Sequence, residues 1–193
     1  NANIVSSNDI KNGFTVPSYF ISRYCFYREN LSYLLGDGTV GVCFKDNSRM
    51  VMDPNEKFIQ FYKNINSKPE VIDIKENEEE ELEEGTILDD KYDDEIKECI
   101  LFIKNVAKSF KKIRFSFNVE KNDYDSDVPL HNVNCFLKND DSILFKLNDK
   151  NIQINFNDCQ KMIIFWNTKK MCFFRNFKEK CNLIDMNTVA SMN

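Results

Sequence analysis

Apolar and polar residues alternate over short runs in the first third of the chain, and turn-forming residues separate the runs. A period of two residues is typical of β-strands that bury one face. Asp37 and Gly38 separate two of the runs, and this pair favours a tight hairpin turn because both residues tolerate positive φ. The pattern therefore predicts an antiparallel meander with strands at about residues 16–27, 33–35, 40–44, 50–52 and 58–62.

A helical spacing replaces the alternation at residues 93–113, where apolar residues recur every three or four positions. This spacing predicts one amphipathic helix. Acidic residues open the segment and basic residues close it, as the helix dipole favours. A polar loop follows, and the alternation then returns. It predicts a second meander with strands at about residues 135–137, 143–147, 152–156, 162–165, 171–174 and 182–184.

The two meanders match each other without a gap when residues 39–64 are aligned with residues 151–176. We call this spacing of 112 residues the repeat offset. Seven of these 26 aligned positions are identical, and at several others a valine of the first segment is aligned with an isoleucine of the second. Turn residues match as well as strand residues, for example Asp46 with Asp158. Any two strand meanders look partly alike, but matched turns indicate one fold that occurs twice.

Charge is distributed unevenly along the 193 residues, whose formal net charge is −5. The segment 70–98 holds 15 acidic residues and three lysines, so it carries −12 and the remainder of the chain carries +7. A block of like charges repels itself and stays solvated. We therefore interpret residues 70–92 as an acidic flexible linker. The alternative is an acidic docking tail that contacts the basic remainder.

The composition sets further limits. A hydrophobic fraction of 42% and an aromatic fraction of 13% are too high for a disordered chain. The length allows one ample core or two small coupled cores. No run approaches the roughly 20 apolar residues of a membrane span, so we expect none. The acidic balance gives no support for a nucleic-acid partner.

The seven cysteines are irregularly spaced and form no CxxC pair, and the only histidine, His131, has no cysteine pair nearby. This pattern indicates free thiols in a reducing compartment, so we expect no metal and no cofactor. We expect His131 to be a surface side chain. A hydrolase pair of Cys159 and His131 is conceivable, but no nucleophile motif accompanies it. We therefore predict no catalytic residue.

Several motifs together give the chain a family resemblance. They are the aromatic segment at residues 17–24, the run LGDGTVGVCFKDNSRM at 35–50, QINF at 153–156 and DCQKMII at 158–164. With these motifs the chain resembles the tandem polo-box domain of a polo-like serine/threonine kinase over about residues 16–186. The Gly-rich loop, HRD and DFG motifs of a kinase catalytic domain do not occur in it.

The resemblance implies an α+β fold of two polo boxes, each a six-stranded antiparallel β-sheet with an α-helix, packed as a sandwich-like pair. The helix that usually follows the last strand of the second box is expected to be truncated. The implied segments are a linker or cap at 1–15, first-box strands at 16–69, the acidic linker at 70–92, the first-box helix at 93–115, a loop at 116–127 and the second box at 128–193.

The resemblance also implies that a peptide with phosphoserine or phosphothreonine binds between the boxes. Lys161 falls on the family's phosphate-binding lysine, and Asn155 would reach the phosphate through water. Cys159 falls on the family's phosphate-binding histidine, and this departure removes a positive charge from the site. Judged without the resemblance, Lys161 would be a solvated charge beside a turn.

The remaining implied contacts lie in the first box. Tyr24 falls on the aromatic residue, usually tryptophan, that packs on the peptide, and Cys25 and Phe26 would supply main-chain contacts. Arg114 and Phe115 would close the groove, and Arg114 would replace the missing charge. The alternative for Tyr24 is a place in the core.

The implied function is that of a non-catalytic targeting and regulatory domain. It would recruit a polo-like kinase to primed substrates in cell division and restrain its own kinase domain until a peptide is bound. We expect a monomer inside the cell, in the cytoplasm or nucleus, at centrosomes or spindle poles and kinetochores. The alternative is a divergent polo-box module for protein interaction or dimerisation that does not need phosphate.

Overall fold

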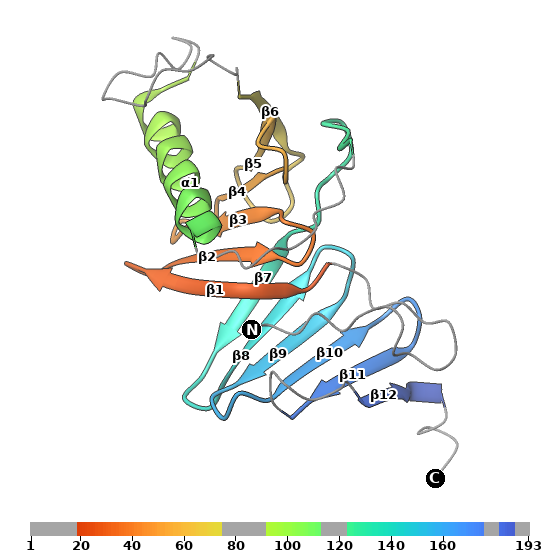
Figure 1. The fold of residues 1–193 in the computed structure, drawn as a ribbon. Helices are drawn as coiled ribbons and strands as arrows, with labels where there is room; N and C mark the ends of the chain where they lie inside the picture. Colours follow the sequence, from red (N-terminus) through yellow and green to blue (C-terminus); the bar gives the residue numbers. More distant parts are fainter. Residues whose placement is uncertain (1–18, 75–91, 113–122, 176–181, 188–193) are drawn as a thin grey trace. The chain divides into compact units, whose positions relative to one another are not determined.

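The computed structural model describes residues 19–74, 92–112, 123–175 and 182–187 and divides into two compact units (Figure 1). The first unit is Ser22–Leu130, and the second joins Asn1–Ile21 with His131–Asn193. Each unit is built on one six-stranded antiparallel sheet, and the first also contains the helix. The predicted α+β class with two six-stranded sheets is therefore confirmed.

The first sheet carries its strands in chain order, so every strand pairs with the next one along the sequence. Residues on both sides of its two central strands are buried, whereas the alternating pattern predicted one buried face. The strands are β1 (Ile21–Tyr27), β2 (Asn30–Leu35), β3 (Val40–Cys43), β4 (Arg49–Met52), β5 (Phe58–Tyr62) and β6 (Glu70–Asp73).

The helix α1 (Asp94–Lys112) lies on one face of this sheet (Figure 1). Asp93 caps its first turn, because the Asp93 carboxylate accepts the N–H of Ile96 at 3.0 Å. The predicted helix at 93–115 is thus observed, and residues 113–115 lie outside the described part. The residues buried between helix and sheet are Leu34, Val40, Val42, Met50, Met52, Ile59 and Ile72 from the sheet and Ile100, Ile103, Ala107 and Phe110 from α1.

The second sheet repeats this order in the second unit. Its strands are β7 (Val133–Lys138), β8 (Ser142–Leu147), β9 (Ile152–Phe156), β10 (Lys161–Phe165), β11 (Lys170–Phe174) and β12 (Asn182–Asp185). A bulge between Val133 and Cys135 interrupts the pairing of β7 with β8. The helix expected after β12 falls almost wholly on residues that the structure does not describe.

The internal repeat extends over all six strands. Each strand of the second sheet begins one repeat offset after its counterpart in the first sheet. For example, β1 begins at Ile21 and β7 at Val133, and β6 begins at Glu70 and β12 at Asn182. The register is also kept: Met52 faces Ile59 in the first sheet, and Ile164 faces Met171 in the second. One repeated fold, as the sequence predicted, therefore accounts for both units.

Two segment boundaries differ from the prediction. Residues 70–73 were assigned to the acidic linker, but they form β6 and pair with β5. Ile72 is buried there while Glu70 and Asp73 are exposed, so the acidic residues occupy the solvent side of an edge strand. Residues 19–21 were assigned to the first box, yet they group with the second unit.

The β8–β9 turn contains a strained residue that the repeat identifies. Lys150 has φ 71°, and its counterpart in the β2–β3 turn is Gly38 with φ 100°. The turns match otherwise, because Asp37 and Asp149 each accept a backbone N–H two residues further on, at 2.9 Å. A side chain in this left-handed region costs about 1–2 kcal/mol.

Lys150→Gly is therefore expected to raise the free energy of unfolding by about 0.5–1 kcal/mol, since the relief of strain exceeds the entropy that glycine loses on folding. Urea unfolding followed by circular dichroism measures the change. Lys150→Ala removes the same side chain but keeps Cβ, and it is expected to leave stability unchanged. An equal gain from alanine would contradict the backbone explanation.

The six cysteines in the described part of the chain are all free thiols. Cys43 and Cys172 are buried, while Cys25, Cys135 and Cys159 are exposed. Within the described residues, no helix has both the length and the apolar character needed to cross a membrane.

Candidate functional site

Lys161 and Asn155 lie opposite each other on one face of the second sheet, because the register pairs β10 with β9 at these residues. The next pair on this face is Ile163 with Gln153. Ile163 belongs to a buried cluster with Phe165 and Cys172, against which Phe20 packs. We call this side of the sheet the Lys161 face.

The ammonium group of Lys161 lies against the first residue of β1, Ile21, and against Phe20 before it. Its Nζ donates to the carbonyl oxygen of Ile21 at 3.3 Å and lies 5.9 Å from the centre of the Phe20 ring. Burial lowers the pKa of Lys161 to about 8, because the charged ammonium loses hydration there. Lys161 is therefore a half-buried cation, and the interpretation as a solvated charge beside a turn is wrong.

Gln153 holds the main chain of Ile21 and also orients Asn155. The N–H of Ile21 donates to Oε1 of Gln153 at 2.8 Å, and Nε2 of Gln153 donates to the Ile21 carbonyl at 2.9 Å. The same Nε2 donates to Oδ1 of Asn155 at 2.9 Å. Sequence reasoning did not select Gln153 as a site residue. Its amide between two isoleucines of a strand was the available signal, since a buried polar group needs a partner.

Cys159 lies in the turn that joins β9 to β10. Its φ is 68°, and its N–H donates to the Phe156 carbonyl at 3.2 Å. Asp158 accepts the N–H of Gln160 at 3.0 Å, and Asp46 does the same for Ser48 in the first unit. The side chain at position 159 is exposed, two residues before Lys161. The turn thus joins the strand that carries Asn155 to the strand that carries Lys161.

Tyr24, Cys25 and Phe26 lie in β1, which is an edge strand of the first sheet. The Tyr24 side chain is 38% exposed, so it is not a core residue, and its ring meets that of Phe26 edge to face at 6.2 Å. Partial burial raises the pKa of the Cys25 thiol. Arg114 and Phe115 lie outside the described residues, so their roles remain predictions.

Arg49 occupies the position in the first unit that Lys161 occupies in the second. The guanidinium carbon lies 4.8 Å from the centre of the Tyr62 ring, and Nη2 donates to the Ile65 carbonyl at 3.5 Å. Both cations therefore lie over an aromatic ring and reach a main-chain carbonyl oxygen. This shared arrangement gives Lys161 a packing role in its own unit.

His131 packs against the chain, in contrast to the predicted surface position. Its ring stacks on Tyr19 with 3.6 Å between the centroids, and Nδ1 lies 3.6 Å from Oδ2 of Asp149. These contacts give no support to a pair of His131 with Cys159. In the described ranges, no group of three or more histidine, cysteine, aspartate or glutamate side chains is placed to hold a metal ion.

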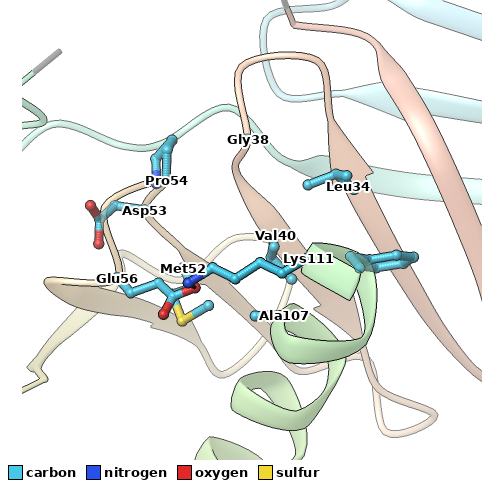
Figure 2. A pocket seen from close by; sticks show the side chains of 10 residues that line it. Leu34, Gly38, Val40, Met52, Asp53, Pro54, Glu56, Ala107 and Lys111 are labelled. Carbon is cyan, nitrogen blue, oxygen red and sulfur yellow. Dashed lines mark ion pairs between the residues drawn. The ribbon is translucent and has the colours of Figure 1, made fainter. Parts of the chain in front are cut away.

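A pocket in the first unit is lined by none of the predicted binding residues that the structure describes (Figure 2). The last turns of α1 form one side through Ala107 and Lys111, and the turns after β2 and β4 form the other. Lys111 pairs with Glu56 across it at 2.5 Å. Asp53 accepts three backbone N–H groups of its own turn. The charged side chains Asp53, Glu56 and Lys111 that line the pocket are thus engaged in contacts within the fold.

Comparisons with known proteins agree with the repeated fold. The sequence matches the family model described as the POLO box duplicated region over residues 28–128 and 139–190. No curated protein sequence gives a match.

Three crystal structures of the polo-box domain of Cdc5 from budding yeast are similar, each with 15% identity over 90% of this chain. The domain alone matches with a TM-score of 0.60 over 66% of its length. The complex with the Dbf4 polo-interacting region matches with 0.58 over 62%, and the complex with the Spc72 phosphopeptide with 0.59 over 61%. The chain thus spans less than two thirds of these chains, and such low identity supports the fold alone.

The family match covers most of the chain in two segments, and each segment contains most of one of the two sheets that the repeat offset relates. The chain therefore belongs to the polo-box family, and its two units form a tandem polo-box domain.

Proposed function

We propose that this tandem polo-box domain binds peptides that carry phosphoserine or phosphothreonine. The observation that carries the proposal is the half-buried ammonium of Lys161 beside Asn155, at the position of the family's phosphate-binding lysine. The Cdc5 polo-box domain in complex with a phosphopeptide supports it. Outside the segment 70–98 the chain carries +7, which suits an anionic ligand.

The groups on the Lys161 face suit a phosphate dianion. An ammonium and an amide N–H both donate to phosphate oxygens, and charge makes the first bond the stronger one. Because Oδ1 of Asn155 already accepts from Gln153, its amide nitrogen is the group that donates to the phosphate, directly or through water. A bound phosphate would raise the pKa of Lys161, since an opposite charge favours the ammonium form.

The first box supplies contacts for the peptide itself in this proposal. The exposed ring of Tyr24 packs on the residue before the phosphorylated one, and the main chain of Cys25 and Phe26 on the edge strand β1 binds the peptide backbone. Arg114 and Phe115 are proposed to add a second positive charge and an apolar wall.

A titration with fluorescent peptides tests this function. A peptide with serine before phosphothreonine is expected to bind at least about 10-fold more tightly than its unphosphorylated twin, because a charge-assisted contact is worth about 1.5–3 kcal/mol. Raising the salt concentration should weaken only the phosphorylated peptide. Equal affinities for the two peptides would overturn the proposal.

Cys159→His is expected to tighten phosphopeptide binding about 5-fold at pH 6, because the imidazolium adds a charged donor beside the phosphate. Position 159 has φ 68°, and histidine tolerates this region better than most residues, so the variant should fold normally. The gain should shrink at pH 8, where the imidazole is neutral. Cys159→Asn is the matched control: it suits the turn as Asn47 does in the first unit, but it adds no charge.

The wider role follows from the same proposal. The domain is the non-catalytic targeting part of a polo-like serine/threonine kinase, and it brings the kinase to substrates or docking proteins that another kinase has already phosphorylated. It restrains its own kinase domain until a peptide is bound. We propose that it acts as a monomer at spindle poles, centrosomes and kinetochores during mitosis.

A second candidate is a polo-box interaction or dimerisation module that does not need phosphate. Two observations favour it: a thiol stands where the family has a histidine, and Lys161 repeats the packing arrangement of Arg49. Light scattering after size-exclusion chromatography separates the candidates. A dimer that persists on dilution, together with equal affinity for the two peptides, would establish this second role.

A further inference from the structure

The segment 19–21 is bound to the second unit by its side chains and by its main chain, and we call it the entry segment. The ring of Phe20 packs against the buried cluster of the Lys161 face. The ring of Tyr19 stacks on His131, and both polar groups of the Ile21 main chain are bonded to one side chain of β9. Three consecutive residues thus attach the entry segment to the unit that carries the phosphate site.

The main chain of Ile21 determines how the amide of Gln153 is oriented. A main-chain N–H can only donate a hydrogen bond, and a carbonyl oxygen can only accept one. Because the Ile21 N–H lies on Oε1 at 2.8 Å and the Ile21 carbonyl on Nε2 at 2.9 Å, only one orientation of the Gln153 amide satisfies both groups. Gln153 is 1% exposed, so the opposite orientation would leave buried polar groups without partners.

The orientation of Gln153 sets in turn the orientation of Asn155. The same Nε2 donates to Oδ1 of Asn155 at 2.9 Å, so the amide nitrogen of Asn155 points away from Gln153. The Ile21 carbonyl also accepts a hydrogen bond from the Lys161 ammonium at 3.3 Å, which directs one of the three donors of that group. The main chain of Ile21 therefore acts on Lys161 directly and on Asn155 through Gln153.

We propose that Gln153 is a positioning residue of the phosphate site and that the docked entry segment is part of this site. The inference rests on the proposed function, because it concerns the two groups proposed to bind the phosphate. With the segment docked, Asn155 presents its NH2 group to the phosphate and the Lys161 ammonium is held in a fixed direction. When the segment leaves the sheet, the Gln153 amide is released, and Asn155 is able to turn its oxygen towards the phosphate.

Docking of the entry segment and binding of a phosphopeptide are therefore coupled. The coupling is reciprocal, since a docked segment that strengthens peptide binding by some factor is itself held more firmly by the same factor in the complex. The segment ends at Ile21, the first residue of β1. Phosphopeptide binding is thus regulated through the chain that enters β1, because a force that detaches residues 19–21 also disorders the phosphate-binding groups.

A buried glutamine of the first unit provides a matched control. Gln60 is fully buried, and its Oε1 accepts the N–H of Leu130 at 2.8 Å. Its Nε2 donates to the carbonyl oxygens of Ser126 and Val128 at 3.0 and 2.8 Å. This side chain also holds the main chain of a distant segment, but it belongs to the other unit and to no proposed binding contact.

Gln153→Met is expected to weaken binding of the peptide with serine before phosphothreonine about 5-fold, because Asn155 and Lys161 lose their fixed orientation. The unphosphorylated twin should bind as it does to the parent protein. Gln60→Met also removes a buried glutamine that holds main-chain groups, so it should lower stability but leave the affinity unchanged. Fluorescence titration measures the affinities, and circular dichroism shows that each variant is folded. The same affinity in Gln153→Met as in the parent would overturn the proposal.

Gln153→Glu tests the orientation of Asn155 itself. A carboxylate still accepts the Ile21 N–H but cannot donate to Asn155, so the Asn155 amide should turn and direct Oδ1 at the phosphate. Asn155→Ala is expected to weaken phosphopeptide binding about 5-fold in the parent protein, where it removes a donor, and not at all in Gln153→Glu, where it removes an acceptor. An equal loss in both backgrounds would contradict the positioning role. A general effect of the new charge or of lower stability would not produce this difference.

Failure of the proposed function is recognised separately, by equal affinity of the parent protein for the two peptides. In that case the side-chain amide resonances of Asn155 in a 15N nuclear magnetic resonance spectrum decide the inference. They should shift in Gln153→Met and stay in place in Gln60→Met. Unshifted Asn155 resonances in Gln153→Met would overturn the positioning role whatever the peptide affinities are.

Discussion

Replacing Gly41 with alanine is expected to destabilise the first unit by about 3 kcal/mol, because the new methyl group has no space. A Cβ atom at Gly41 would lie 2.0 Å from Cζ of Tyr33 and 2.2 Å from its hydroxyl oxygen. Tyr33 sits directly opposite on the neighbouring strand and is fully buried, so its ring cannot swing into solvent. The strand pair must separate or the ring must leave its place in the core.

A double mutant separates this clash from other effects of the substitution. Tyr33→Leu alone should cost stability through a cavity and a lost hydroxyl. If the clash is the cause, Gly41→Ala should add little to Tyr33→Leu, so the two effects should be strongly non-additive. Urea unfolding followed by far-ultraviolet circular dichroism measures all three variants. Additive losses would mean that the ring of Tyr33 is not what excludes a side chain at Gly41.

The repeat explains why this glycine was not recognisable in the sequence. The counterparts of Tyr33 and Gly41 are Phe145 and Gln153, which face each other in the second sheet. There Gln153 stands in place of the glycine beside the aromatic ring, and its amide is bound to Ile21, far away in sequence. Strand positions and turns follow from local alternation, but the space left for a side chain in a cross-strand pair depends on long-range contacts.

The strand β6 shows a second limit of the sequence pattern. Its acidic residues placed it in the predicted linker, although Ile72 between them is buried against the core beneath α1. An edge strand presents one side to solvent, so a high charge density is compatible with pairing. The repeat offset that relates the two meanders would have predicted β6 from β12, had it been applied beyond residue 64.

The candidate site was predictable to the extent that it lies within one hairpin. Asn155, Cys159 and Lys161 are brought together by β9, β10 and their turn, so motif and spacing suffice. The burial of Lys161 was not predictable, because Phe20 and Ile21, which cover it, lie near the other end of the chain. The contribution of Tyr24, Cys25 and Phe26 to a binding site stays a prediction.

Lys161→Met is expected to weaken phosphopeptide binding by about 10- to 30-fold while it makes the protein more stable. Methionine keeps an unbranched apolar side chain that is one atom shorter, but it removes the charge-assisted bond to the phosphate, which is worth about 1.5–3 kcal/mol. At neutral pH the folded protein holds an ammonium in a site that lowers its pKa from 10.5 to about 8. Each unit of this shift corresponds to about 1.4 kcal/mol, so removing the charge should add on the order of 2 kcal/mol to the free energy of unfolding after the loss of the bond to Ile21.

The slope of the free energy of unfolding against pH distinguishes the loss of the Lys161 charge from a packing defect, because a packing defect would not change this slope. Between pH 8 and about 10.4 the unfolded chain binds a proton at Lys161 that the folded chain has lost, so the stability of the parent protein should rise with pH in this window. The rise should be smaller in Lys161→Met by the contribution of this one group. Affinity for the phosphopeptide should fall over the same window in the parent protein, because the neutral amine loses its attraction for the phosphate.

Lys146→Met is the matched control for both readouts, since it removes an exposed lysine from the same sheet on the opposite side. It should change neither the affinity for the phosphopeptide nor the slope of stability against pH by a measurable amount. A loss of binding in a protein that has become more stable cannot be ascribed to unfolding, so the pair of measurements assigns the effect to the Lys161 ammonium. Unchanged affinity in Lys161→Met with raised stability would instead show that Lys161 serves packing alone, as Arg49 does in the first unit, and would favour the module that binds without phosphate.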